Sequence, residues 1–131
     1  MEHRIDGSIP GRTAESAHFT GEVTMQVLAA AEDPGRHRVY RVTFQPGART
    51  NWHTHPYGQT LYVLSGRGRA GSEHGGTIEM GPGDTVHFAA NERHWHGAGP
   101  DGEMVHLAIG EARDGVPADW AEPVTDADPD G

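Results

Sequence analysis

A chain of 131 residues is long enough to bury one core, and its composition excludes several kinds of chemistry. The sequence has no cysteine, which excludes disulfides, thiolate catalysis and cysteine-built zinc sites. It has no lysine, which excludes Schiff-base chemistry, and none of its serines lies in the G-x-S-x-G sequence that many serine hydrolases use.

The net charge of −9 is unevenly distributed, because residues 114–131 carry six acidic and no basic side chains. The rest of the chain is only mildly acidic and has no basic stripe, so we expect no nucleic-acid partner. No apolar run approaches the ~20 residues that span a bilayer, and the N-terminal residues lack the apolar stretch of a signal peptide. We therefore expect a cytoplasmic protein without membrane association.

Taken in chain order, the sequence predicts short strands separated by turns. Residues 1–24 show weak periodicity and are expected to form an arm with a short strand or helix at the edge of the fold. The segments with strand character are residues 25–31, 38–44, 59–64, 67–70, 77–80, 85–89 and 103–109. Glycine and proline turn signals separate them, and no helical pattern intervenes. The pattern predicts an all-β sandwich or barrel and not a parallel α/β sheet.

This organisation divides the chain into three parts. Residues 1–34 are expected to be an N-terminal arm with edge strands, residues 35–112 the barrel core, and residues 113–131 an acidic tail. The tail is rich in proline, aspartate and alanine, and we expect one helical turn in it to dock Trp120 before the end frays.

Two histidine clusters carry the strongest chemical signal, one at residues 52–55 (WHTH) and one at residues 94–96 (HWH). Side chains at positions i and i+2 of an extended segment point to the same face, so His53 and His55 are expected to direct two imidazoles at one point. Gln59 opens the next strand on the face of its apolar row. His94 arrives from a separate hairpin and completes the set.

Three imidazoles and a carboxamide that converge in an apolar barrel mouth form a metal site on chemical grounds. Neutral imidazole suits zinc, manganese, iron, copper and nickel, and the same side chains without a metal would be poorly satisfied buried polar groups. The alternative is a surface pair that arose by chance, since ten of the 131 residues are histidine. The second cluster and the flanking glycines favour the metal site.

The spacing of these residues resembles the cupin superfamily over about residues 35–112. Gly47, five residues, His53-Thr54-His55, three residues, Gln59, six residues and Gly66 match the first cupin motif. Gly83-Asp84 leading to His94 matches the second motif. The resemblance implies a single-domain cupin, which is a double-stranded β-helix or jelly-roll barrel.

The sequence departs from the usual cupin pattern in both motifs. The first motif usually has glutamate at the position of Gln59. The second usually has proline, glycine and asparagine at the positions of Ala89, Asn91 and Ala98. The turn chemistry of the second motif can therefore differ, whereas the ligand spacing is intact.

A narrower resemblance covers most of the chain, including the tail. The stretches GARTNWHTHPYGQTLYV, PGDTVHF, ERHWHGA, HLAI and DWAEPVTD are similar to small bacterial manganese-dependent cupins that act as hydroxynitrile lyases. This resemblance implies that His53, His55, Gln59 and His94 bind one divalent metal ion per chain. Manganese is expected, with iron, nickel and zinc as alternatives. The resemblance also implies a small-molecule substrate and a homo-oligomer, either a dimer or a tetramer.

Chemistry at such a site needs a proton carrier, and the candidates are His96 and His106. His96 lies two residues from a ligand, and His106 alternates with Met104 and Ala108 on its strand. The alternatives are that His96 caps a turn and that His106 orients a ligand from behind. The residues expected to line the substrate pocket are Tyr40, Val42, Tyr57 and Gly110.

Three functions fit these features. The first is a metal-dependent lyase of the hydroxynitrile lyase kind, which cleaves a cyanohydrin to an aldehyde and hydrogen cyanide. The second is a cupin dioxygenase that acts on a small aromatic substrate. The third is a non-enzymatic module that binds a metal or small ligand. Four neutral ligands leave the full charge on the metal, which strengthens a Lewis acid and favours the lyase over the dioxygenase.

Overall fold

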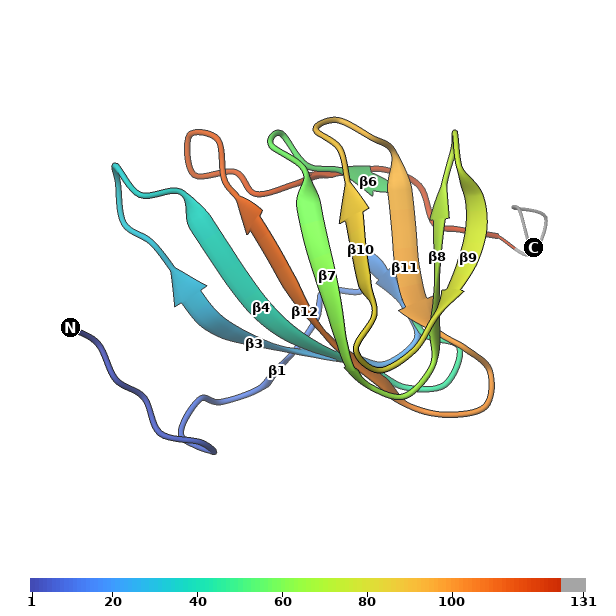
Figure 1. Cartoon of the computed structure of the whole chain (residues 1–131), viewed down its shortest axis with the longest axis horizontal. Helices are drawn as coiled ribbons and strands as arrows, with labels where there is room; N and C mark the ends of the chain where they lie inside the picture. Colours follow the sequence, from blue (N-terminus) through green and yellow to red (C-terminus); the bar gives the residue numbers. More distant parts are fainter. Residues whose placement is uncertain (126–131) are drawn as a thin grey trace.

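The structure is a computed structural model that describes residues 1–125, in which all regular elements are strands. Residues 126–131, where the end of the tail is expected to fray, lie outside the described residues. Figure 1 shows two sheets that curl around a common interior. The strands are β1 Arg12–Thr13, β2 Phe19–Thr20, β3 Val23–Ala30, β4 His37–Phe44, β5 Arg49–Thr50, β6 His53–Thr54, β7 Gln59–Ser65, β8 Gly68–Ser72, β9 Gly76–Met80, β10 Thr85–Phe88, β11 His94–Ala98, β12 Met104–Glu111 and β13 Asp119–Trp120.

The first sheet has six strands in the order β1-β3-β4-β12-β7-β10, and all its pairs are antiparallel. The expected alternation of side chains is present on its central strands. In β7, Gln59, Leu61 and Val63 are buried, whereas Tyr62 and Leu64 are exposed. The face with the buried row packs against the barrel interior, and the other face of the sheet is exposed.

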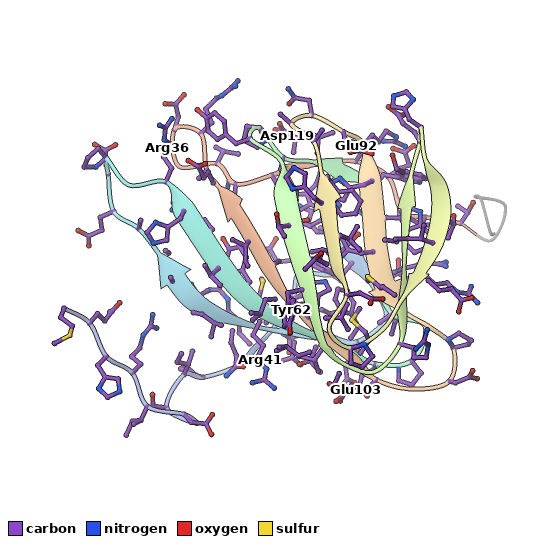
Figure 2. All side chains as sticks on the ribbon, in the orientation of Figure 1. Arg36, Arg41, Tyr62, Glu92, Glu103 and Asp119 are labelled. Carbon is purple, nitrogen blue, oxygen red and sulfur yellow. The ribbon has the colours of Figure 1, made fainter. Side chains whose placement is uncertain are left out.

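The second sheet holds the order β13-β6-β11-β5-β2, and the β8–β9 hairpin also pairs with β11. Its short strands come from distant parts of the sequence. β11 pairs with β5 and β6, and these two strands pair in turn with β2 and β13. Figure 2 places Glu92 and Asp119 at one end of the barrel and Glu103 at the opposite end. The loops that precede β11 and β13 therefore meet at the same end.

The strands expected from the sequence are confirmed to within about two residues. The expected helical turn at Trp120 is wrong, because this residue lies in β13 and pairs with His53 in β6. The physical reason is the free edge of β6. Its neighbour Trp52 receives a hydrogen bond at its carbonyl from the Ala121 amide (2.8 Å) and donates its own amide to the Glu122 carbonyl (2.9 Å). Backbone pairing with this edge outweighs the local helical preference of the tail.

The core consists of side chains from both sheets. Phe44, Leu61, Met80 and Met104 are at most 1% exposed and belong to the main apolar cluster. A smaller buried cluster of Trp52, Trp95 and Val124 packs separately. No helix that could cross a membrane occurs in the part of the chain that the structure describes.

Candidate metal centre and substrate cavity

The two histidine clusters meet because β6 and β11 are neighbouring strands. His53 and His94 are directly opposite each other in the antiparallel pairing, and their ring centroids are 4.3 Å apart. The ring of His55 lies 4.9 Å from that of His53 and 5.3 Å from that of His94. All three side chains are buried, so three imidazoles from two separated segments converge at one point.

Each of these three imidazoles is oriented by a main-chain carbonyl, to which its Nδ1 donates a hydrogen bond. The acceptors for His53, His55 and His94 are the carbonyls of Asn51 (2.9 Å), Pro117 (2.8 Å) and Glu92 (2.8 Å), respectively. In a neutral ring this leaves a lone pair on Nε2. A carbonyl behind the ring is the usual arrangement around metal-binding histidines, because it fixes both the tautomer and the direction of the free nitrogen.

Gln59 adds an oxygen to this set. Its Oε1 lies 3.3 Å from Nε2 of His94, although both atoms are acceptors once His94 donates through Nδ1. Nε2 of His55 is buried and has no hydrogen-bond partner among residues 1–125. Lone pairs that face one another without a proton between them fit a bound cation. The donor chemistry of the site therefore suits a divalent metal ion.

Local backbone geometry holds Gln59 and His55 in place. Gly58 has a φ of +86°, and a Cβ at this position would lie 2.6 Å from the Phe88 carbonyl oxygen, so only glycine permits this approach. Asn91 has a φ of +63° and donates its amide to the His55 carbonyl (2.9 Å). Asparagine tolerates this left-handed conformation, which explains how it replaces the glycine that cupins usually have there.

Burial keeps all of these histidines neutral. It lowers the pKa of His94 to about 4, although the Glu92 carbonyl opposes the shift. The pKa of His53 is well below its usual range because of burial and the neighbouring imidazoles of His94 and His55, and burial also lowers the pKa of His55. Neutral imidazole is the form that binds metal, so the rings are ready to coordinate at neutral pH.

His96 and His106 form a second pair directly beside the first group. Nδ1 of His96 lies 2.9 Å from Nε2 of His106, and both rings are buried. Their outer nitrogens, Nε2 of His96 and Nδ1 of His106, have no hydrogen-bond partner within the described residues. One ring nitrogen each of His53, His94 and His96 lie within 4.8 Å of one another, so these three residues could hold a metal ion.

A cavity of about 240 Å³ opens over the histidines. Its walls are mostly apolar, with a few polar groups, which is typical of a site for a small organic molecule. The side chains of His53, His55, Gln59 and His96 face it from the interior. The other lining residues are Arg12, Glu15, His18, Phe19, Met25, Tyr40, Val42, Thr50, Ala108, Pro117, Ala118 and Trp120.

Of the four residues expected to line the substrate pocket, Tyr40 and Val42 line this cavity. Tyr57 and Gly110 do not, and the structure places them at a separate surface depression that Gln59 also borders. Tyr57 lies on the turn before β7 and is held outward by Arg36, which donates to its hydroxyl (3.1 Å). Gly110 lies near the end of β12 and next to Gln59 in the register, beyond Ala108, which borders the cavity.

Sequence reasoning missed the contribution of the two chain ends to the cavity. Phe19 comes from β2, Met25 from β3 and Trp120 from β13. The Trp120 ring stacks on His18, with centroids 4.5 Å apart and planes at 6°, and it lies 4.6 Å from the ring of His53. The weak periodicity of the N-terminal segment gave no signal for this placement, although an aromatic residue in a polar tail indicates docking.

Fold and site together define the class of protein. A family model described as the cupin domain matches residues 40–110, and the chain belongs to the cupin family. Among characterised relatives, (R)-mandelonitrile lyase from Granulicella tundricola is 49% identical over 126 residues, which cover 96% of each chain.

Solved structures agree with this assignment. A cupin-like protein from Thermotoga maritima matches with a TM-score of 0.83 and 40% identity over 88% of each chain. The polyketide cyclase RemF from Streptomyces resistomycificus matches with a TM-score of 0.77 over 98% of this chain and 89% of its own, at 20% identity. The second likeness shows the shared fold alone.

Proposed function

We propose that the protein is a metal-dependent hydroxynitrile lyase, which cleaves an aromatic cyanohydrin to an aldehyde and hydrogen cyanide and catalyses the reverse addition. The observation that carries the proposal is the 49% identity to an (R)-mandelonitrile lyase across 96% of both chains. The cavity supports it, because a mostly apolar space of about 240 Å³ suits a small aromatic molecule whose polar end meets the histidines.

In this proposal the metal ligands are His53, His55, Gln59 and His94. The three histidines of this set share the same orientation, in which Nδ1 donates to a main-chain carbonyl and Nε2 keeps a lone pair. His96 differs, because its Nδ1 faces another imidazole and not a carbonyl. We therefore assign His96 to proton transfer and not to coordination.

A divalent cation held there, manganese in this proposal, supplies Lewis-acid activation of the cyanohydrin hydroxyl oxygen. All four ligands are neutral, so no ligand charge weakens that activation. The chain's own residues then bind and orient the substrate. Phe19, Met25 and Trp120 contact the aromatic ring, and the hydroxyl points toward His96.

Nε2 of His96 takes the hydroxyl proton, the bond between the carbinol and nitrile carbons breaks, and cyanide leaves with the bonding electron pair. The same proton then passes from His96 to cyanide, so that aldehyde and hydrogen cyanide are the products. His106 accepts a hydrogen bond at Nε2 from Nδ1 of His96 and stabilises the charge that His96 carries between these transfers.

The test is turnover of racemic mandelonitrile under anaerobic conditions by protein loaded with manganese, followed as benzaldehyde release. Elemental analysis of the purified protein gives the metal content in parallel. We expect one metal ion per chain and cleavage that continues without oxygen. Tight metal binding without cleavage, or consumption of oxygen with aromatic substrates, would refute the lyase.

A further inference from the structure

Asn51 is a buried residue that connects the candidate metal centre to both ends of the chain. Its side-chain Nδ2 donates hydrogen bonds to the carbonyls of Ala17 and Ala121, each at 3.0 Å. Its main-chain amide donates to the His18 carbonyl (2.8 Å), and its own carbonyl accepts the hydrogen bond from Nδ1 of His53. Asn51 is 4% exposed, so water does not compete for these bonds.

We propose that Asn51 is a positioning residue that couples metal binding to the docking of the two terminal segments, residues 12–20 and 117–124, over the cavity. The inference rests on the proposed metal centre. Docked segments hold the ligand rings in their coordinating orientation, and a bound metal in turn stabilises the docked segments.

The terminal segments are well placed for this role because both wall the cavity and the C-terminal one also contacts the ligands. Pro117 supplies the carbonyl that orients His55, and Trp120 packs on the ring of His53. The N-terminal segment supplies Phe19 to the cavity and His18 to the stack on Trp120. Release of the C-terminal segment would remove a cavity wall and the carbonyl that orients His55. Release of the N-terminal segment would remove Phe19 from the cavity and the ring of His18 that stacks on Trp120.

The residue type matches the task. Among uncharged side chains, a primary amide nitrogen offers two donors on one atom, which satisfy the two carbonyls of Ala17 and Ala121. A carboxylate of the same shape would place oxygen against oxygen in a buried site, and alanine would leave both carbonyls unsatisfied. Asn51→Asp therefore removes the connection with almost no change of side-chain volume.

Thermodynamic linkage makes the coupling measurable from either side. Removal of a partner that orients a metal ligand typically lowers metal affinity by about 10- to 100-fold. We expect Asn51→Asp and Asn51→Ala to weaken manganese binding by this factor. The matched control is Gln45→Ala, since its amide donates to Glu103, at the end of the barrel opposite Asp119 and Glu92 (Figure 2). Gln45→Ala should bind manganese like the parent protein.

The first measurement is titration with Mn²⁺, with the visible absorption of the Co²⁺-loaded protein as a report on ligand geometry. A changed cobalt spectrum in the Asn51 variants, with the control unchanged, supports the positioning role. Unchanged affinity and an unchanged spectrum in a folded Asn51→Asp protein would overturn it.

A second measurement uses the parent protein and does not depend on any variant folding. Hydrogen exchange is followed with and without Mn²⁺ at the amides of Asn51, Trp52 and Ala121, whose bonds join the segments to the barrel. The reference amides are Gly83 and Asp84 in the turn before β10. If Mn²⁺ slows exchange more at the first group of amides than at the reference amides, the coupling is supported. Equal slowing at both groups, or no slowing at either, refutes it. Failure of the parent protein to bind any manganese would instead overturn the proposed metal centre, and with it this inference.

Discussion

His96 on β11 and His106 on β12 face each other across the barrel interior, with Nδ1 of the first 2.9 Å from Nε2 of the second. A single hydrogen bond joins the two neutral imidazoles, in which one ring donates and the other accepts. Phe44 packs against both rings, and both histidines are buried. The remaining nitrogen of His96 is unpartnered among the described residues, which is the arrangement that a proton carrier needs.

Replacement of His96 should separate chemistry from metal binding. We expect His96→Ala to retain the metal and to lose turnover by about 10²- to 10⁴-fold, the usual contribution of a general acid–base group. The control is His87→Ala, because His87 lies on the outer face and pairs with the Thr60 hydroxyl. Metal analysis and mandelonitrile cleavage are the measurements, and a rate for His96→Ala near that of the parent would exclude His96 from proton transfer.

The identity of the ligands can be tested one histidine at a time. We expect His53→Ala, His55→Ala and His94→Ala each to lose the metal, because each removes one of the Nε2 donors that a carbonyl orients. His74→Ala, on the exposed β8–β9 turn, should keep it. Elemental analysis after dialysis is the measurement. Loss of metal from His96→Ala with retention in His55→Ala would instead support coordination by His53, His94 and His96.

A substitution in the cavity wall should impair substrate binding, whereas a substitution on the outer face of the same strand should not. Ala108 points into the cavity from β12, and the next residue, Ile109, is exposed on the opposite face. Ala108→Leu adds three carbons to a small space, so we expect a higher KM for mandelonitrile and a destabilisation of about 1–3 kcal/mol. Ile109→Leu should leave KM unchanged and should change the free energy of unfolding by no more than about 0.5 kcal/mol. Steady-state kinetics and urea unfolding of both variants measure the difference, and an unchanged KM for Ala108→Leu would exclude this cavity as the substrate site.

Acidification should destabilise the metal-free protein. Burial lowers the pKa of His94 and of His106 to about 4, from an ordinary value of 6.5. Between these two values the unfolded chain binds a proton at each position and the folded chain does not. The free energy of unfolding therefore falls as the pH is lowered through this window, by about 1.4 kcal/mol per pH unit for each such histidine. Above the upper value their contribution is constant.

Urea unfolding of the metal-free protein between about pH 7 and pH 5 measures this slope while most carboxylates stay ionised. His106→Gln removes one of the buried imidazoles. It should reduce the dependence of the free energy of unfolding on pH by about 1.4 kcal/mol per pH unit. Equal free energies of unfolding at both ends of this range would contradict the assignment of neutral, buried rings.

Much of the fold was accessible from sequence because its signals are local. Alternation in residues 59–64 and the glycines that follow predicted β7, and the i, i+2 rule correctly placed His53 and His55 on one face. The glycine spacing of the cupin motifs predicted the family. Asn91 shows why a departure from that motif is tolerated, since it adopts the left-handed conformation that the usual glycine would adopt.

The errors have a common cause, which is that contacts distant in sequence decided the outcome. Trp120 lies in a strand and not in a helical turn because the edge of β6 offers it backbone partners. Tyr57 was expected near the site from its position between His55 and Gln59, yet Arg36 holds it on the outside.

The sequence by itself determined which donor atoms are available and in what order they occur, since side-chain chemistry and strand periodicity are properties of neighbouring residues. Only the tertiary structure decided that the arm and the tail wall the cavity and that carbonyls of Asn51 and Pro117 orient two of the rings. These contacts join segments with no pattern in common, and they form because buried donors and acceptors must find partners wherever the barrel brings them together.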